Sequence, residues 1–222
     1  FNCSIFAYGQ TGSGKSYSMM GTGGEMSRVM ASEQRGLIPR ICEALFNRVG
    51  GPKGLGNADG TVAKQKKSED DSNMNDMQWN FAVTYLEIYQ ERVYDLLSSA
   101  DGNINDVEAP RNLRIREHPT RGAYAEGLNE CIVTNYKDVE DYIHKGSKAR
   151  TVASTNMNLE SSRSHAVFTI ILKSRSKEKG LRSDSCVRLV DLAGSERAKK
   201  SGATGERLKE GSNINKSLSA LS

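Results

Sequence analysis

The sequence predicts an α/β fold in which a mixed central β-sheet has helices on both of its faces. An apolar strand at residues 4–8 leads directly into a glycine-rich loop and the start of a helix, which is typical of sheets that contain parallel strands. A second apolar strand, at residues 186–192, carries an acidic residue near its end. The strand pattern at residues 163–174 is joined to it by a short charged turn. These two strands are therefore expected to pair antiparallel and to make the sheet mixed.

The composition indicates one polar globular domain. The chain has 222 residues, a formal net charge of +4 and 36% hydrophobic residues. Its 21 glycines bring the apolar fraction close to the average of about 45–50% for globular proteins. The longest apolar run, at residues 166–172, is far shorter than the roughly 18 residues of a membrane span, and no stretch resembles a signal peptide. We therefore expect no transmembrane segment and no secretion signal in this chain.

The four cysteines are far apart in the sequence, and no histidine lies near any of them. The chain thus has no CxxC pair for a metal or for redox chemistry, and we expect four buried, reduced thiols, as in a cytosolic protein. The cysteines are Cys3, Cys42, Cys131 and Cys186.

The first half of the chain combines a strand, a helix and a polar segment. Residues 4–8 are expected to form a buried strand. An apolar residue recurs at every fourth position further on, as on one face of a helix. These apolar residues are Leu37, Ile41, Leu45 and Val49. Residues 50–78 have few large apolar side chains, so we predict a flexible surface insertion within the domain. Alternating aromatic and β-branched residues then indicate a strand at residues 79–89.

The second half of the chain is expected to contain a hairpin, a helix and the two paired strands described above. Residues 113–116 alternate in polarity, and a Pro–Gly turn separates them from residues 124–128, which predicts a hairpin. Residues 138–150 favour a helix, and a further helical pattern begins at about residue 206.

The glycine-rich loop after the first strand matches the phosphate-binding pattern G-x4-G-K-[ST]. Its glycines let backbone N–H groups converge on phosphate oxygens, and the helix that follows adds the positive end of its dipole. We expect Lys15 to contact the β- and γ-phosphates and Ser16 to bind Mg²⁺. The predicted nucleotide-binding residues are Gly9, Gln10, Thr11, Gly12, Ser13, Gly14, Lys15, Ser16 and Tyr17. The strand–loop–helix context therefore predicts a P-loop NTPase.

Two further segments carry polar groups suited to a nucleotide site. Asp191 ends an apolar strand, where it can reach Mg²⁺ directly or through water, and Gly194 follows it with an unhindered backbone N–H. Alone, an aspartate after a strand is an ordinary turn. Residues 158–165 (Asn-Leu-Glu-Ser-Ser-Arg-Ser-His) offer hydroxyls and a cation just before a strand, although by composition they are equally a plain polar loop.

These three motifs, in this order, resemble the nucleotide-sensing motifs of kinesin motor domains. They are Gly-Gln-Thr-Gly-Ser-Gly-Lys-Ser at residues 9–16, Asn-x-x-Ser-Ser-Arg-Ser-His at 158–165 and Asp-Leu-Ala-Gly-Ser-Glu at 191–196. The likeness covers nearly the whole chain except residues 50–78 and 98–110. The segment Arg116-Glu117-His118-Pro119, with Gly122 and Tyr124, is similar to the class-three kinesins that transport vesicles and organelles.

The resemblance implies ATP and Mg²⁺ as cofactors and assigns roles to matched residues. In switch I (residues 158–165), Ser162 would sense Mg²⁺ and the γ-phosphate, and Ser161 would lie near the attacking water. In switch II (residues 191–196), Gly194 would sense the γ-phosphate. Arg163 would pair with Glu196, which would order or deprotonate the water. The expected catalytic residues are Lys15, Ser161, Ser162, Arg163, Gly194 and Glu196. The expected Mg²⁺ site, partly through water, is Ser16, Ser162 and Asp191.

Basic residues are concentrated towards the end of the chain. Residues 173–209 hold eleven Lys or Arg against five Asp or Glu, a net charge of +6. By charge alone this is a solvated basic face, but the resemblance implies contact with the acidic surface of microtubules in the cytoplasm. The expected contacts are Arg197, Lys199, Lys200, Arg207, Lys209 and Lys216. No basic stripe with interleaved aromatic residues favours nucleic acid.

The resemblance also implies that residues 1–222 are part of a kinesin motor domain, with segments of the domain on both sides missing and with cargo and oligomerisation regions absent. An ATP-dependent microtubule motor is the favoured function, and a non-motile or inactive microtubule-binding fragment is the alternative. A GTP-dependent switch would need an Asn-Lys-x-Asp motif, which Asn135-Tyr136-Lys137-Asp138 approaches with its lysine displaced. A myosin-like motor fits Asp-Leu-Ala-Gly-Ser-Glu less well. A non-catalytic binder would have lost Lys15, Arg163, Gly194 or Glu196, and all four are present.

Overall fold

The computed structural model describes residues 2–21, 34–49, 77–98, 111–120, 122–157, 161–176 and 182–195. In this part of the chain eight strands form one sheet in the order β1-β8-β7-β2-β3-β4-β5, with β6 paired to β2. The strands are β1 (Asn2–Ala7), β2 (Met77–Tyr89), β3 (Arg92–Asp95), β4 (Arg111–His118), β5 (Gly122–Glu126), β6 (Cys131–Val133), β7 (His165–Ser176) and β8 (Arg182–Asp191). The helices are α1 (Lys15–Met20), α3 (Leu37–Val49) and α5 (Tyr136–Met157), with a short 3₁₀ turn at Ser161–Arg163.

The mixed sheet predicted from the sequence is confirmed. The long strands β2, β7 and β8 pair antiparallel, whereas β1 runs parallel to β8 along its whole length. Because successive side chains on a strand point to opposite faces, the register places one row of large apolar residues on a single face of the sheet. Val83 lies opposite Ile170, Tyr85 opposite Phe168, and Phe168 opposite Leu189. All five of these side chains are almost completely buried.

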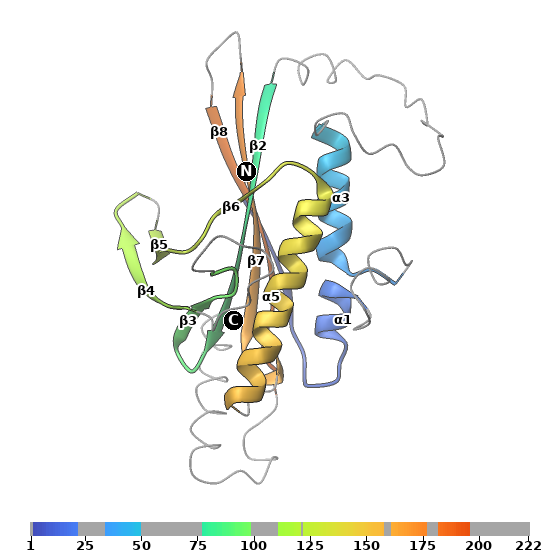
Figure 1. Ribbon diagram of the computed structural model, residues 1–222, viewed down its shortest axis with the longest axis vertical. Helices are drawn as coiled ribbons and strands as arrows, with labels where there is room; N and C mark the ends of the chain where they lie inside the picture. Colours follow the sequence, from blue (N-terminus) through green and yellow to red (C-terminus); the bar gives the residue numbers. More distant parts are fainter. Residues whose placement is uncertain are drawn as a thin grey trace.

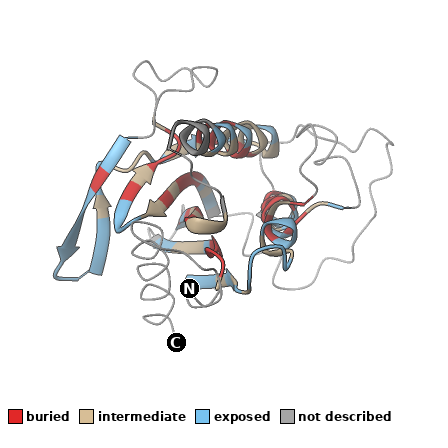
Figure 2. Cartoon of the chain, turned by 90° about the horizontal axis from the view of Figure 1, so that it is seen from below, coloured by how far each residue is buried: buried red, intermediate tan, exposed pale blue. Residues whose placement is uncertain are grey.

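The three described helices all pack on that one face of the sheet (Figure 1). Their buried residues face the strands, as Figure 2 shows in red. The core joins Met19 of α1, Ile38 and Phe46 of α3 and Ile143 of α5 to the apolar row of the strands. The ring of Phe46 stacks on Phe81 of β2 with centroids 4.5 Å apart. The first helical layer of the predicted fold is therefore present.

The predicted apolar face of α3 is only partly correct. Ile41 and Leu45 are partly buried and pack against the core, but Leu37 is 41% exposed. The most buried apolar positions are Ile38, Cys42 and Phe46, one residue further along. Two overlapping sets of apolar residues thus share a spacing of four, and packing against Phe81 and its neighbours buries the second set more deeply.

The expected thiol burial is also only partly correct. All four cysteines are free, but Cys42 alone is buried and Cys3 is exposed, because β1 has only β8 beside it among the described strands. Burial raises the pKa of the Cys42 thiol to about 12, so this thiol stays protonated.

Three predicted element boundaries or burial patterns differ from the structure. Strand β1, expected to be buried, is mostly exposed, and its Phe6 side chain is 50% exposed. Strand β2 already begins at Met77, so the predicted insertion at residues 50–78 extends two residues too far, and residues 50–76 lie outside the described residues.

Helix α5 begins at Tyr136 and continues to Met157, well past the predicted end at residue 150. Asp138 supports its start by accepting hydrogen bonds from the backbone N–H groups of Thr134 and Asn135.

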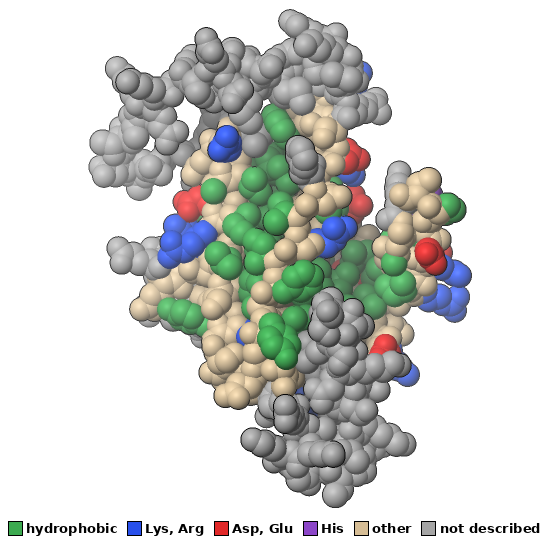
Figure 3. Space-filling view, turned by 180° about the vertical axis from the view of Figure 1, so that it is seen from behind, with side chains coloured by type: hydrophobic (Ala, Val, Ile, Leu, Met, Phe, Trp, Pro, Cys, Tyr) green, Lys and Arg blue, Asp and Glu red, His purple; other side chains and the backbone are tan. Residues whose placement is uncertain are grey.

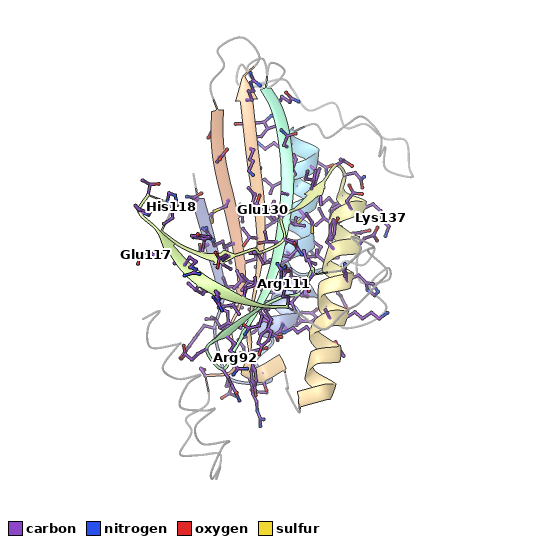
Figure 4. All side chains as sticks on the ribbon, turned by 60° about the vertical axis from the view of Figure 1, so that its left-hand side comes forward. Arg92, Arg111, Glu117, His118, Glu130 and Lys137 are labelled. Carbon is purple, nitrogen blue, oxygen red and sulfur yellow. The ribbon has the colours of Figure 1, made fainter. Side chains whose placement is uncertain are left out.

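The predicted hairpin is confirmed as β4 and β5, which project from the edge of the sheet. Figure 4 shows Glu117 and His118 at its outer end, on the opposite side of the molecule from Lys137 of α5. Arg116 of β4 pairs with Glu126 of β5 at 3.1 Å, and Arg111 donates to the Gly127 carbonyl. Charged side chains therefore line this hairpin.

The second face of the sheet carries apolar side chains that no described helix covers. Val190 and Leu192 form a small cluster with Val167 on this face, and Ile132 is 76% exposed. Figure 3, seen from behind, shows hydrophobic side chains gathered along the middle of the molecule. The helices expected on the second face are not among the described residues. Among the helices that are described, none is both long and apolar enough to cross a membrane.

The contact between Gly146 and Tyr85 gives a test of this packing. A Cβ atom added to Gly146 would lie 2.1 Å from Cδ1 of Tyr85, whose buried ring also meets Phe168 edge-on. Alanine favours a helix over glycine by about 1 kcal/mol, whereas forcing atoms into a packed core costs about 1–3 kcal/mol or more. We expect Gly146→Ala to lower the free energy of unfolding, measured by chemical denaturation of the full-length protein. The exposed Lys148→Ala on the same helix serves as the control, and a Gly146→Ala variant as stable as that control would contradict the packing.

Candidate functional site

The glycine-rich loop connects β1 to α1 and is shaped by backbone angles that only glycine adopts easily. Gly12 has φ +79° and Gly14, which precedes the first residue of α1, has φ +89°. The Ser13 N–H donates to the Gln10 carbonyl at 3.2 Å, and the Lys15 ammonium donates to the same carbonyl at 2.8 Å. The loop thus places the Lys15 ammonium directly over its own backbone, at the start of the helix.

Ser16, the first-turn residue expected to bind Mg²⁺, is bonded to the acidic residue at the end of β8. Its hydroxyl donates to Asp191 Oδ2 at 2.6 Å, across 175 positions of sequence. Asp191 is only 6% exposed, and its other oxygen, Oδ1, is buried and has no hydrogen-bond partner among the described residues. Because the Ser16 proton points to the carboxylate, the lone pairs of its oxygen remain for a cation.

This pair therefore fits a magnesium ion. The Ser16 hydroxyl oxygen, and the Asp191 carboxylate oxygen that lacks a partner among the described residues, are ligands of the kind that Mg²⁺ prefers. The described residues contain no group of three His, Cys, Asp or Glu side chains that could hold a metal alone. Such a site suits an ion whose remaining ligands are water and phosphate oxygens, as in nucleotide-binding proteins.

The segment after β8 bonds to the phosphate loop and to the switch I segment at once. The Leu192 N–H donates to the Ala7 carbonyl at 3.2 Å, and the Ser195 N–H donates to the Gly9 carbonyl at 3.0 Å. Between them, the Gly194 N–H donates to the Ser162 carbonyl at 2.7 Å. Three stretches that lie far apart in the sequence therefore meet at one place in the fold.

A buried ionic network lies behind this meeting point and was not predicted from the sequence. Arg150 of α5 donates from Nε to Glu87 Oε1 at 3.1 Å, and its Nη1 lies 3.5 Å from Asp191 Oδ2. Its Nη2 donates to the Ser164 carbonyl and hydroxyl, and the Ser164 hydroxyl donates to Glu87 Oε1 at 2.5 Å. One guanidinium thus connects helix α5, strand β2, switch I and the end of β8.

The charge of Arg150 is stabilised by its neighbours. Burial works against that charge, but the attraction of the Glu87 and Asp191 carboxylates opposes it, and the pKa of Arg150 is raised above its ordinary value. A single sequence signal could have indicated the network: Glu87 interrupts the alternate row of apolar residues on β2, from Trp79 to Tyr85, that faces the helices. Its partner could not be read from sequence, because Arg150 lies 63 residues away on another element.

The structure describes some of the predicted site residues, and the others lie outside the described part of the chain. The phosphate loop, Ser162, Asp191 and Gly194 are brought together, Ser161 and Arg163 belong to the 3₁₀ turn, and Tyr17 lies on α1 with 51% exposure. Outside the described residues lie Glu196, Arg197, Lys199, Lys200, Arg207, Lys209 and Lys216. The roles of all these residues remain predictions.

A strand, a glycine-rich loop, a helix and a neighbouring strand that ends on a carboxylate bonded to the first-turn serine define a P-loop NTPase. The sequence model of the protein family "Kinesin motor domain" matches residues 1–222, which is the whole chain. The chain therefore belongs to the kinesin motor domain family.

The curated relatives include class-three transporter kinesins, as the sequence indicated. The chain is 46% identical to the kinesin-like protein unc-104 of Caenorhabditis elegans over 225 residues and 46% identical to KIF1A of Rattus norvegicus over 225 residues. It is 47% identical to the kinesin-related protein 1 of Dictyostelium discoideum over 226 residues. All of this chain is matched, but only 12%, 11% and 9% of those relatives, respectively, is covered.

Two solved structures show the same fold. The first is a fast kinesin, described for its ATPase mechanism and its interactions with microtubules, with a TM-score of 0.74 and 39% identity. The second is a KIF14 dimer in a two-heads-bound state, with AMP-PNP and in complex with a microtubule, with a TM-score of 0.69 and 37% identity. The match covers 100% and 99% of this chain but 52% and 53% of those chains, so the chain spans about half of their length.

The Arg150 network predicts a specific pattern of stability changes. We expect Arg150→Met to lower the free energy of unfolding by about 3–5 kcal/mol, because it leaves the buried Glu87 and Asp191 carboxylates without their cation. Adding Glu87→Gln should recover part of this loss, since one unpaired charge is then removed. Chemical denaturation of the full-length variants measures both effects.

The control for that experiment is Arg116→Met, which removes an exposed ion pair with Glu126 and should cost no more than about 1 kcal/mol. Equal losses for Arg150→Met and Arg116→Met would show that the buried network does not stabilise the fold.

Proposed function

We propose that this chain is the nucleotide-hydrolysing part of a microtubule motor, which binds ATP with Mg²⁺ at the phosphate loop and couples hydrolysis to its grip on the filament. The observation that carries the proposal is the direct bonding of switch II to both other motifs. The Gly194 N–H donates to the Ser162 carbonyl, and the Ser195 N–H donates to the Gly9 carbonyl. A movement of any one of the three segments is therefore transmitted to the other two through these bonds.

In this proposal the phosphate loop and the magnesium pair hold the nucleotide. Lys15 contacts the β- and γ-phosphates, and Ser16 binds Mg²⁺ while Asp191 holds the ion through water. The exposed Tyr17 on the first turn of α1 contacts the nucleotide beyond its phosphates. The geometry of Ser16 and Asp191 supports this assignment, because one carboxylate oxygen already orients the serine hydroxyl and the other has no hydrogen-bond partner in the described part of the chain.

In this proposal switch I and switch II change their relative position according to whether a γ-phosphate is bound. The Gly194 N–H has a protein acceptor, the Ser162 carbonyl, and a γ-phosphate oxygen would be a second, charged acceptor for the same donor. Exchange of one acceptor for the other would shift switch I against switch II only when a γ-phosphate is present. Ser162 then senses Mg²⁺ and the γ-phosphate, and Ser161 lies near the attacking water. Arg163 pairs with Glu196, which orders or deprotonates that water.

The proposed filament partner rests on charge and on the relatives. Residues 173–209 have a net charge of +6, and a similar kinesin is known in complex with a microtubule. Attraction between this basic segment and an acidic filament surface would speed association and weaken with salt. We therefore place the protein on cytoplasmic microtubules, with the contact at Arg197, Lys199, Lys200, Arg207, Lys209 and Lys216.

The catalytic assignment predicts the behaviour of Glu196→Ala. We expect the full-length variant to bind ATP as the wild type does but to hydrolyse it at least about a hundredfold more slowly, because general-base help to the water is lost. Single-turnover hydrolysis and fluorescent-nucleotide binding measure the two quantities separately. Normal microtubule-stimulated turnover in this variant would refute the role of Glu196, and stimulation by actin, or a preference for GTP over ATP, would refute the proposed class of motor.

The basic segment predicts a second outcome. We expect Lys199→Ala/Lys200→Ala to raise the microtubule concentration needed for half-maximal ATPase stimulation while the basal rate stays the same, since only filament attraction is reduced. The matched control is Lys137→Ala/Lys148→Ala, which removes two charges from the exposed side of α5. If both pairs change the half-stimulating concentration equally, net charge rather than this segment determines binding.

A further inference from the structure

Four successive backbone N–H groups follow strand β8, and each one has a different acceptor. Those of Leu192, Gly194 and Ser195 donate to the main-chain carbonyls of Ala7, Ser162 and Gly9. The N–H of Ala193 is the exception, because it donates to a side chain, Nδ1 of His165, at 2.9 Å. This bond can therefore be removed by substitution without changing the main chain.

His165 is the first residue of β7 and only 7% of it is exposed. Since Nδ1 accepts a hydrogen bond, the ring is the neutral tautomer with its proton on Nε2. Burial lowers the pKa of His165, which favours this neutral form. Ala193 is completely buried, so its N–H has no solvent in reach and would lose its acceptor outright if the ring were removed.

The bonds on either side of Gly194 define how freely it can move. On one side the Ala193 N–H is held by His165, and on the other the Ser195 N–H is held by the phosphate loop at Gly9. Between these two fixed points lies the Gly194 N–H, which contacts switch I. The Gly194 N–H lies in the peptide that joins Ala193 to Gly194, so its direction changes with the ψ angle of Ala193 and the φ angle of Gly194. Glycine permits the widest range of φ, so the Ala193 side must be held if this N–H is to keep one direction.

We propose that His165 is a positioning residue that holds the main chain at Ala193 and so sets the direction in which the Gly194 N–H points. The inference rests on the proposed function, in which that N–H distinguishes ATP from ADP. His165 acts through Ala193 and does not touch the nucleotide. Its role depends on an acceptor at the position of Nδ1, and not on the ring as such.

Three substitutions separate the acceptor from the ring. His165→Asn keeps an acceptor, because Oδ1 of asparagine is two bonds from Cβ, as Nδ1 of histidine is. His165→Gln moves the acceptor one bond further out, and His165→Leu removes it while keeping an apolar side chain of similar size. All three are made in the full-length protein, and their melting temperatures are measured first.

Two readouts follow. Hydrogen exchange of the peptide that contains Ala193 and Gly194, measured without nucleotide, reports the bond itself. The ratio of the dissociation constants for ADP and a non-hydrolysable ATP analogue reports γ-phosphate discrimination. We expect His165→Leu and His165→Gln to exchange about tenfold faster and to lose about tenfold in that ratio, and His165→Asn to remain within about threefold of the wild type in both.

The outcomes are distinguishable. If His165→Asn is as impaired as His165→Leu, or if His165→Leu matches the wild type in both readouts, the inference is overturned while the proposed function stands. If His165→Leu fails to fold, the comparison of His165→Asn with His165→Gln decides in the same way. A wild-type protein that binds neither nucleotide would overturn the proposed function and this inference with it, whatever the exchange data show.

Discussion

The burial of one carboxylate, Asp191, constrains much of the structure around it. A charged group removed from water needs partners, and this one receives them from two separate helices: the Ser16 hydroxyl of α1 and the Arg150 guanidinium of α5. Each helix is thereby fixed at the same end of β8. The phosphate loop, which precedes α1, takes its place relative to the sheet as a result of this arrangement.

The same carboxylate also explains why the interior on this side of the sheet is not simply apolar. Arg150 is shared between Asp191 and Glu87, and Ser164 completes the set by bonding to both Arg150 and Glu87. Each member of this network has at least one partner, which gives a defined arrangement, while Asp191 Oδ1 has no hydrogen-bond partner among the described residues. Here it ties switch I to the helix that packs over the sheet, so the nucleotide site and the core are one structural unit.

Much of the fold and part of the site could be predicted from the sequence because they depend on residues that are neighbours in the chain. The phosphate loop, the hairpin and the antiparallel pair β7–β8 follow from residues that are close together in the chain. What could not be predicted depends on tertiary context: which of two overlapping apolar sets on α3 is buried more deeply, that β1 lies exposed beside β8, and that Glu87 meets an arginine on α5. The roles of Glu196 and the basic residues that follow it rest on resemblance, since they lie outside the described residues.

The parallel pairing of β1 with β8 has a consequence for how the protein is made. Asn2–Ala7 is synthesised before the strand that pairs with it, because Asn2 pairs with Cys186, 184 positions further along the chain. A nascent chain that ends before β8 contains the entire phosphate-loop sequence with its first strand unpaired and its serine without a carboxylate. Contacts between residues so distant in sequence form slowly and leave apolar surface open to other chains in the meantime. The first strand can therefore complete its pairing only after translation has passed β8, and the bond between Ser16 and its carboxylate cannot form before that point.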